Sequence, residues 1–296
     1  IILIHANHRI PIKLLKNYLP DDGTERYSLH NIAVPGNAAD ILKNPLKYLA
    51  SIFRAKKFLN SNEIDIIHCN DGPLRYIWFY AALFSKSKFV LMQRGFATNN
   101  WEKKISYYLL DGVICNSQFT LSHLPAKPKN RKIAVSYPPV LNNSKILETK
   151  SSLKQELKKN LGVTQDTTII GYVANMRKCK RPEIFIEAAY KLQKAQPAKR
   201  LFLLLGTFYD GLESELKGLV KKRGLEKCVV FPGFKNNNLE YVAGFDIFVA
   251  TSVKEPFGRV LLEAMNLETP VVASRSGGHC EMIKHKKTGL FAEPDN

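Results

Sequence analysis

Short apolar runs alternate with longer helical patterns along the whole 296-residue chain, and this alternation limits the possible folds more than any other feature. Strands and helices that alternate at this spacing favour parallel sheets covered by helices on both faces. The expected strands are residues 1–5, 32–34, 64–68, 88–92, 112–115, 133–136, 168–173, 200–205, 229–231, 247–250 and 270–273. The expected helices include residues 73–84, 152–161, 182–193, 211–223 and 259–267. The fold class is therefore α/β.

A polar stretch at residues 141–150, L-N-N-S-K-I-L-E-T-K, separates two blocks of these strands and has no apolar period of its own. Together the blocks hold more strands than one such sheet usually contains. We therefore expect two Rossmann-like, doubly wound domains, residues 1–145 and 146–296. In such sheets ligands bind outside the carboxyl ends of the strands, and a cleft forms there when two domains face each other.

The chain is strongly basic, with 44 Lys and Arg against 26 Asp and Glu and a formal charge of +18. A positive potential attracts phosphates of any kind, whether in nucleic acid, anionic lipid or nucleotide. The clearest local concentration of positive charge lies in residues 40–60. Apolar side chains recur there at helical spacing, with cations between them. The cations between them are Lys43, Lys47, Arg54, Lys56 and Lys57. Such a helix could lie on an anionic membrane, or it could pack on a sheet with a solvated lysine face.

Composition and topology signals narrow the class further. The apolar fraction of 45% excludes disordered and fibrous classes. The longest apolar run, residues 77–84, is far shorter than the ~20 residues that span a bilayer. The first residues do not have the pattern of a signal peptide, and the five cysteines form no C-x-x-C pair. We expect a cytoplasmic protein with reduced thiols, at most peripheral to the inner face of a membrane.

The loop after the strand at 168–173 carries four cations in the sequence N-M-R-K-C-K-R-P-E. They are Arg177, Lys178, Lys180 and Arg181. Pro182 and Glu183 mark the start of the following helix. Free backbone N–H groups at a helix start, with Arg and Lys beside them, suit a diphosphate. The alternative is a solvated turn with incidental lysines.

Two further loops follow strands in the second half. In the first, Glu255 lies at a loop tip and Glu263 comes eight residues later, about two helical turns and ~12 Å of rise away. The two carboxylates could reach different parts of one extended ligand, or Glu263 could simply pair with Arg259 on the helix surface. In the second loop, Gly277 and Gly278 allow close approach to a ligand, or form a tight structural turn.

These motifs resemble the nucleotide-binding domain of GT-B glycosyltransferases, specifically the large retaining family 4. The diagnostic pattern is E-x7-E, here Glu255 to Glu263, followed by A-M, by P-V-V-A-S…G-G…E and by T-G-L at 288–290. K-C-K-R-P-E-I-F-I-E-A and V-V-F-P-G-F precede it in the family's order. A weaker resemblance over residues 60–140 rests on D-I-I-H, D-G-V-I-C-N-S and I-A-V-S-Y-P-P-V.

The resemblance implies roles for matching positions. Arg177 and Lys180 would neutralise the diphosphate of the donor, and Arg177 would stand in for the family's G-R, which is Ala174-Asn175 here. Glu255 would hold hydroxyls of the donor sugar and Glu263 would accept hydrogen bonds from the ribose. The remaining donor-binding positions are the phosphate-binding backbone of Phe257, Gly258 and Arg259, and Gly233 and Phe234 near the base.

The same resemblance implies a front-face retaining reaction, in which a donor phosphate oxygen helps to deprotonate the acceptor. It implies no cofactor and no metal, because D-x-D is absent and the basic loop would replace a divalent cation. The co-substrate would be a nucleoside-diphosphate sugar of the UDP or GDP type. Acceptor-side candidates are His8, His68 and Arg94, the last standing where the family often has a histidine. The family also continues beyond G-L-F-A-E-P-D-N, so we expect a C-terminally truncated chain.

The sequence therefore predicts a retaining glycosyltransferase that moves a sugar from a nucleotide-sugar donor to a glycan or lipid-linked acceptor in surface polysaccharide or lipopolysaccharide assembly. One alternative is a sugar-nucleotide epimerase-like enzyme on the same GT-B architecture. The other is a basic nucleic-acid-binding protein. The chain has no zinc-finger or helix-turn-helix signature and no aromatic interleaving of its cations, which argues against a nucleic-acid partner.

Overall fold

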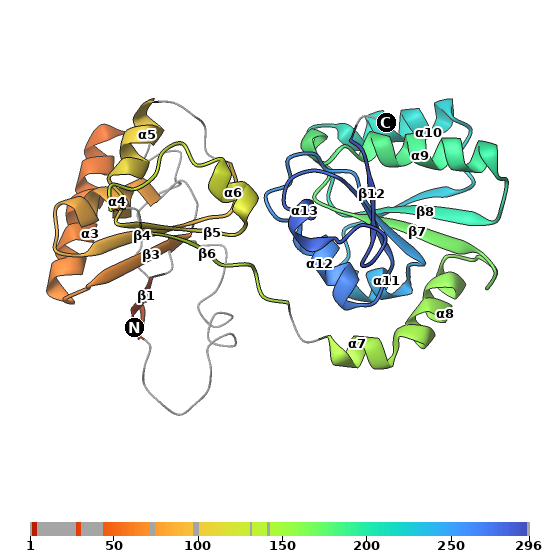
Figure 1. Ribbon diagram of the computed structural model, residues 1–296, viewed down its shortest axis with the longest axis horizontal. Coiled ribbons are helices and arrows are strands. Elements are labelled where there is room, and N and C mark those ends of the chain that lie inside the picture. The colour runs from red at the N-terminus through yellow and green to blue at the C-terminus, as the bar shows by residue number, and fades with distance from the viewer. Residues whose placement is uncertain are drawn as a thin grey trace. The chain divides into compact units, whose positions relative to one another are not determined.

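The computed structural model describes residues 2–4, 28–30, 44–70, 75–96, 101–130, 132–140 and 143–294 (Figure 1). The chain divides into two compact units. One comprises Ile1–Cys115 and Leu124–Ala134, and the other comprises Asn116–His123 and Val135–Asn296. Both units are α/β, as the alternation of apolar runs predicts. The domain limits at residues 145 and 146 stay a prediction.

The first unit is built around a four-stranded sheet in the order β3-β4-β5-β6, in which β3 pairs with β4 and β4 with β5 in parallel. Its described strands are β1 (Ile2–Ile4), β2 (Ser28–His30), β3 (Ile66–Asn70), β4 (Lys88–Gln93), β5 (Gly112–Cys115) and β6 (Ile133–Val135). Its described helices are α3 (Pro45–Ser61), α4 (Arg75–Leu83) and α5 (Trp101–Tyr108). The strands β1 and β2 form a separate parallel pair. The strand expected at 32–34 lies outside the described residues.

The helix expected within residues 40–60 begins at Pro45, so the proline opens the helix instead of interrupting it. A proline is favoured at the first helical position because its missing N–H has no intrahelical partner there. The side chain of Asn44 caps the start by accepting a hydrogen bond from Lys47 N at 3.1 Å. Ile52, Ala55 and Leu59 form the buried face of this helix.

The second unit has a six-stranded parallel sheet in the order β12-β11-β10-β7-β8-β9. Its strands are β7 (Thr168–Val173), β8 (Arg200–Leu205), β9 (Val229–Gly233), β10 (Ile247–Ala250), β11 (Val271–Ser274) and β12 (Leu290–Ala292). Its helical segments are α6 (Gln118–Ser122), α7 (Ser144–Glu148), α8 (Lys150–Asn160), η1 (Lys178–Lys180), α9 (Pro182–Ala195), α10 (Leu212–Lys222), α11 (Asn238–Gly244), α12 (Arg259–Asn266) and α13 (His279–Met282). The strand β12 has no counterpart among the predicted strands.

The strand order of this sheet reverses at β7. From β7 the chain adds β8 and β9 on one side, and then β10, β11 and β12 on the other. The loops that leave β7 and β10 therefore diverge at the carboxyl ends of two neighbouring strands. Such a topological switch point is where open α/β sheets bind their ligands.

Helices cover both faces of the six-stranded sheet (Figure 1), and each face carries its own apolar core. Ile170, Tyr172 and Phe202 face α9 and α10, while Ile169 and Leu203 face α8, α11 and α12. Adjacent residues of one strand point to opposite faces, so a strand buried on both faces is apolar throughout. This explains why the sequence of β8, R-L-F-L-L-L, is almost continuously apolar.

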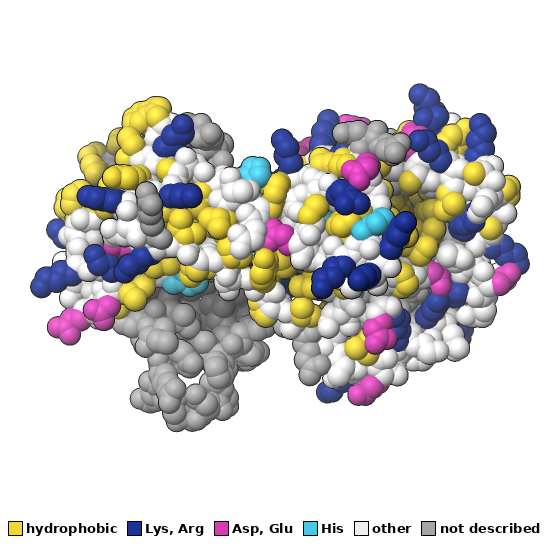
Figure 2. All heavy atoms as spheres, viewed as in Figure 1, with side chains coloured by type: hydrophobic (Ala, Val, Ile, Leu, Met, Phe, Trp, Pro, Cys, Tyr) yellow, Lys and Arg dark blue, Asp and Glu magenta, His cyan; other side chains and the backbone are white. Residues whose placement is uncertain are grey.

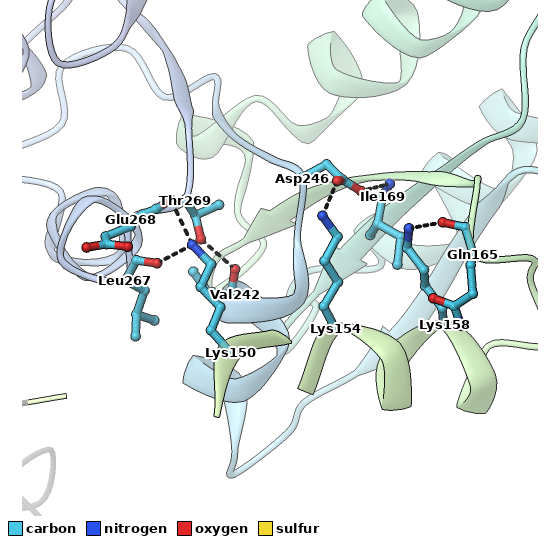
Figure 3. Close-up of polar contacts among 10 residues, drawn as sticks. All are labelled: Lys150, Lys154, Lys158, Gln165, Ile169, Val242, Asp246, Leu267, Glu268 and Thr269. Atoms are coloured by element: carbon cyan, nitrogen blue, oxygen red, sulfur yellow. Dashed lines mark hydrogen bonds and ion pairs between the residues drawn. The ribbon is translucent and has the colours of Figure 1, made fainter. Parts of the chain in front are cut away.

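Helix α8 is attached to the rest of its unit by three lysines on one face, at positions i, i+4 and i+8 (Figure 3). Lys150 Nζ donates to the carbonyls of Leu267 and Glu268, at 2.6 and 2.8 Å. Lys154 pairs with Asp246, and Lys158 Nζ donates to the Gln165 carbonyl at 2.7 Å. Lys150 and Lys154 thus join α8 to segments that are distant in the sequence, while Lys158 ties the end of the helix to the loop that follows it.

We expect Asp246→Ala to lower the free energy of unfolding by about 1–3 kcal/mol. The Asp246 carboxylate accepts the backbone N–H of Ile169 at 2.8 Å as well as the Lys154 ammonium, so its loss leaves both donors without this acceptor. Urea unfolding measures the change. The matched control is Asp166→Ala, which removes a pair with Lys199 whose side chains are 63% and 64% exposed and should lower stability much less. Equal losses of stability in the two variants would contradict the stabilising role of the Asp246 carboxylate.

Candidate functional site

Three loops meet the carboxyl ends of adjacent strands in the second unit. We call them the basic loop (residues 174–181, after β7), the glutamate loop (residues 251–258, after β10) and the glycine turn (residues 275–278, after β11). They contain most of the site residues that the sequence predicts. Because β7, β10 and β11 are neighbours in the sheet, the fold brings these segments together.

The basic loop is anchored to β7 and to the glutamate loop through its backbone. Thr251 Oγ1 donates to the carbonyls of Lys180 and Arg181, at 3.0 and 2.8 Å. Tyr172 Oη donates to the Lys180 carbonyl at 2.6 Å. Burial raises the pKa of the Tyr172 hydroxyl, which therefore remains a donor at all ordinary pH values. Arg181 has a positive φ of 53° and closes the loop directly before Pro182 starts α9.

The ammonium of Lys180 forms an ion pair with the carboxylate of Glu255. The two side chains are 26% and 12% exposed, so the pair is half-buried at the switch point. A pair in this position holds one cation and one hydrogen-bond acceptor at fixed places. It offers both kinds of group to a ligand that carries an anion next to hydroxyl groups.

The glutamate loop ends in the first turn of α12. Gly258 precedes Arg259 with a positive φ of 99°, and no side chain caps this helix start. The first N–H groups of a helix have no intrahelical partners and carry a partial positive charge. Phe257 is buried, at 4% exposure, so it anchors the loop while its backbone remains at the helix start.

Glu263 lies about one turn into α12 and pairs with Arg259 at 3.4 Å. The expected separation of two helical turns from Glu255 is wrong, because Glu255 lies in the loop before the helix begins. The ion pair that the sequence offered as an alternative to ligand binding is therefore present. Burial raises the pKa of the Glu263 carboxyl, and the nearby Arg259 lowers it by less. The carboxylate is 21% exposed while Arg259 is 62% exposed, so the pair leaves Glu263 in a costly environment for a charge.

The glycine turn lies directly against the glutamate loop. The backbone N–H of Gly278 donates to the Glu255 carbonyl at 2.8 Å. A Cβ atom at Gly277 would lie 2.4 Å from the Glu255 oxygen, and one at Gly278 would lie 2.5 Å from Phe257 Cα. The two glycines thus permit close approach of two backbones, which is the structural alternative that the sequence left open.

His279 completes this support and was missed by the sequence analysis. It is buried at 1% exposure, with Nδ1 3.3 Å from the Ser274 carbonyl and with its other ring edge against Gly258. Burial lowers the pKa of His279, and Lys180 lowers it further although Glu255 raises it. Its only sequence signal is its position after two glycines, which does not distinguish a packing residue from an exposed one.

Gly233 and Phe234 lie at the end of β9, two strands from β7 in the sheet. Gly233 has a positive φ of 73°, and its carbonyl accepts the N–H of Gly206 at 3.0 Å. Phe234 is 65% exposed. Their proximity to a nucleotide base stays a prediction.

The acceptor-side candidates belong to the first unit. His68 is an exposed residue within β3, paired in register with Val90, and Arg94 is an exposed residue that directly follows β4. His8 lies outside the described residues. Among the residues that the structure describes, no group of three His, Cys, Asp or Glu side chains could hold a metal ion.

We expect Gly278→Ala to weaken nucleotide binding by displacing the glutamate loop, because the added Cβ would meet backbone atoms that cannot rotate away. The matched control is Gly218→Ala in α10, where an added Cβ meets nothing within 4 Å. That change should raise the free energy of unfolding by about 0.5–1 kcal/mol. Urea unfolding and titration with UDP measure both effects. Unchanged binding in Gly278→Ala would contradict the supporting role of the turn.

We expect Glu263→Gln to raise the free energy of unfolding at about pH 7 and to leave it unchanged at about pH 4. The folded state holds the Glu263 proton more tightly than the unfolded state, since burial raises its pKa above 4.5. Stability therefore falls as pH rises from about 4.5 through the raised pKa, and glutamine escapes this loss. Urea unfolding at both pH values tests the sign. Glu213→Gln, from the exposed i,i+4 pair with Lys217, is the control and should show no such gain.

Each half of the chain matches a described protein family. The family described as "Glycosyl transferases group 1" matches residues 154–296, and "Glycosyltransferase Family 4" matches residues 8–140. The N-acetyl-alpha-D-glucosaminyl L-malate synthase of Bacillus anthracis is 37% identical over 139 residues, 47% of this chain and 35% of that protein. The lipopolysaccharide core biosynthesis mannosyltransferase LpsB of Rhizobium meliloti is 31% identical over 147 residues, 48% of this chain and 42% of that protein.

A solved structure gives the same fold. The crystal structure of Anabaena Alr3699/HepE in complex with UDP and glucose superimposes with a TM-score of 0.73 at 21% identity, covering 96% of this chain and 75% of that one. The two parallel-sheet α/β units thus match GT-B glycosyltransferase structures. The chain is thus similar to group 1 glycosyltransferases over residues 154–296 and to family 4 glycosyltransferases over residues 8–140. The chain spans about a third of the length of the first curated relatives.

Proposed function

We propose that this protein is a retaining glycosyltransferase that moves a sugar from a nucleoside-diphosphate sugar to a glycan or lipid-linked acceptor. The observation that carries the proposal is the Lys180–Glu255 pair at the switch point between β7 and β10, beside the uncapped start of α12. A diphosphate needs fixed positive charge, and a sugar needs acceptors for its hydroxyl groups. This pair supplies both.

Each group at the site has a role in this proposal. The ammonium of Lys180 and the guanidinium of Arg177 stabilise the negative charge that grows on the leaving diphosphate as the glycosidic bond breaks. Glu255 accepts hydrogen bonds from the transferred sugar. The backbone N–H groups of residues 257–259 hold phosphate oxygens, Glu263 accepts from the ribose, and Gly233 and Phe234 flank the base.

The proposed reaction keeps the anomeric configuration without a covalent protein intermediate. The acceptor hydroxyl attacks from the face that the diphosphate leaves, and a donor phosphate oxygen receives its proton. The fixed cations of the basic loop supply the charge that a divalent ion supplies elsewhere, so we propose a metal-independent enzyme. The support is that the basic loop has its charge held in place by Thr251, Tyr172 and Glu255.

The similar proteins guide the choice of substrates. HepE binds UDP and glucose, so UDP is the first nucleotide to test, with GDP second. LpsB acts in lipopolysaccharide core biosynthesis, which favours a lipid-linked or polysaccharide acceptor, with His68 and Arg94 on the acceptor side. The pathway proposed here is accordingly surface polysaccharide or lipopolysaccharide assembly.

We expect Lys180→Ala to lower kcat for sugar transfer by about 10²–10³-fold, because one preorganised charge at the leaving group is lost. The control is Lys178→Ala in the same loop, whose exposed ammonium lies 4.0 Å from Glu215 and should matter less than about twofold. Released UDP and the anomeric configuration of the product, by NMR, are measured together. Equal losses, or an epimerised sugar without transfer, would contradict the proposal.

The first unit offers a surface for peripheral membrane contact at the inner face of a membrane. In α3, Leu46, Leu49 and Phe53 are 78%, 50% and 66% exposed, beside the cations Lys47 and Lys57. Figure 2 shows hydrophobic and basic side chains interspersed over this part of the unit. Such a surface fits an anionic bilayer that carries a lipid-linked acceptor. Among the described residues, no helix combines the length and the hydropathy needed to cross a bilayer.

We expect the triple charge reversal Lys47→Glu, Lys56→Glu and Lys57→Glu to weaken binding to phosphatidylglycerol vesicles roughly a hundredfold at low salt. The control reverses Lys217, Lys221 and Lys222, three exposed cations of α10 in the second unit, and changes the net charge equally. Vesicle sedimentation at several salt concentrations measures both. If the two triple variants lose vesicle binding equally, the binding depends on the net charge of the whole chain and not on the α3 surface. The proposal that α3 contacts the membrane would then be wrong.

A further inference from the structure

Arg177 lies over an aromatic ring that the sequence analysis did not single out. Its guanidinium carbon is 4.3 Å from the centroid of the Tyr209 ring. Arg177 is exposed and Tyr209 is half-buried, so the ring is the more enclosed member of the pair. At this distance the cation interacts with the electron-rich face of the ring.

Tyr209 is fixed because the loops after β7 and β8 continue the pairing of their strands. Ala174 N donates to the Leu205 carbonyl at 3.1 Å, Met176 N to the Thr207 carbonyl at 2.8 Å, and Tyr209 N to the Met176 carbonyl at 3.2 Å. The segment around Met176 thus forms hydrogen bonds with the Tyr209 segment on both sides. The backbone of Tyr209 has little freedom to move away from the basic loop.

Two further features keep these loops together. Gly206 has a φ of 140°, and a Cβ atom there would lie 1.8 Å from the Ala174 carbonyl oxygen, so this close approach requires glycine. Met176 is completely buried, and the ring of Phe208 packs on Phe231 with centroids 5.8 Å apart. With Met176 and Phe208 directed into the core, their neighbours Arg177 and Tyr209 are left at the surface, against each other.

We infer that Tyr209 is a positioning residue that holds the Arg177 guanidinium ready for the diphosphate of the donor. The inference rests on the proposed function. The position that precedes the loop's cations is Asn175, which has no charge, so the loop depends on Arg177 and Lys180 for its fixed charge at this edge. A planar guanidinium binds two phosphate oxygens side by side, which requires a defined orientation.

The expected gain is one of preorganisation. Immobilising a long side chain on binding lowers affinity by roughly three- to tenfold, and a side chain already stacked on a ring avoids part of that loss. In this inference Tyr209 acts only through Arg177, which it contacts directly. Its effect must therefore disappear when Arg177 is removed.

The test is a double-mutant cycle on the affinity of the full chain for UDP, with GDP in parallel, by isothermal titration calorimetry. Tyr209→Leu should weaken binding about three- to tenfold, and Tyr209→Phe, which keeps the ring face, should restore it. In the Arg177→Gln background the Tyr209→Leu change should alter the affinity by less than about twofold. Tyr190→Leu is the control. The Tyr190 ring lies 4.9 Å from the guanidinium carbon of Arg223 in a similar contact outside the three loops of the site, so this change should leave UDP affinity unchanged.

Two results would overturn the inference while leaving the proposed function intact. One is wild-type affinity for UDP in Tyr209→Leu. The other is an equal loss in the presence and absence of Arg177, which would indicate a purely structural role. A wild-type chain that binds neither UDP nor GDP would instead contradict the proposed function itself, and the inference with it. Circular dichroism of each variant identifies a loss caused by unfolding, and Tyr209→Phe then decides the outcome.

Discussion

The candidate site depends on one arrangement, the attachment of the basic loop to the glutamate loop at the point where the sheet reverses its strand order. The hydroxyl of Thr251 holds the Lys180 and Arg181 carbonyls, and the Lys180 ammonium holds the Glu255 carboxylate. Backbone and side chain of Lys180 are thus tied to the same neighbouring loop. A cation that is fixed before a ligand arrives stabilises developing negative charge without reorganisation at the moment of reaction. Without this attachment the loop would be a solvated turn with mobile lysines.

The rest of the second unit supports that arrangement from behind. Gly277 and Gly278 let the turn after β11 reach the backbone of the glutamate loop, and His279 fills the space beneath Gly258. On the other side, the paired loops after β7 and β8 present Arg177 on Tyr209. The turn after β11 can approach the glutamate loop so closely because it contains glycines. The other two supports are contacts made by the side chains of His279 and Tyr209. The glycine turn, His279 and the paired loops after β7 and β8 thus hold the polar groups of the site in place from the side that faces the core.

Much of the architecture could be predicted from local patterns. The strands β7, β8 and β10 have the limits that their apolar runs predict, because both of their faces are buried and nothing polar interrupts them. The short strand β12 has the sequence L-F-A and exposed ends, so no pattern distinguishes it from a loop. Pro45 begins its helix, and the Asn44 cap there depends on local geometry that periodicity does not report.

By itself the sequence determined the α/β class, the loops that carry charge, and the E-x7-E spacing that places one carboxylate before the start of α12 and one within it. These follow from period, composition and turn residues, which act over a few neighbouring positions. Only the tertiary structure decided the partners: Lys180 with Glu255, Arg177 with Tyr209, and His279 with the backbone of Gly258. Such pairs join strands far apart in the chain. Their contacts depend on strand order and register, which local propensity does not specify.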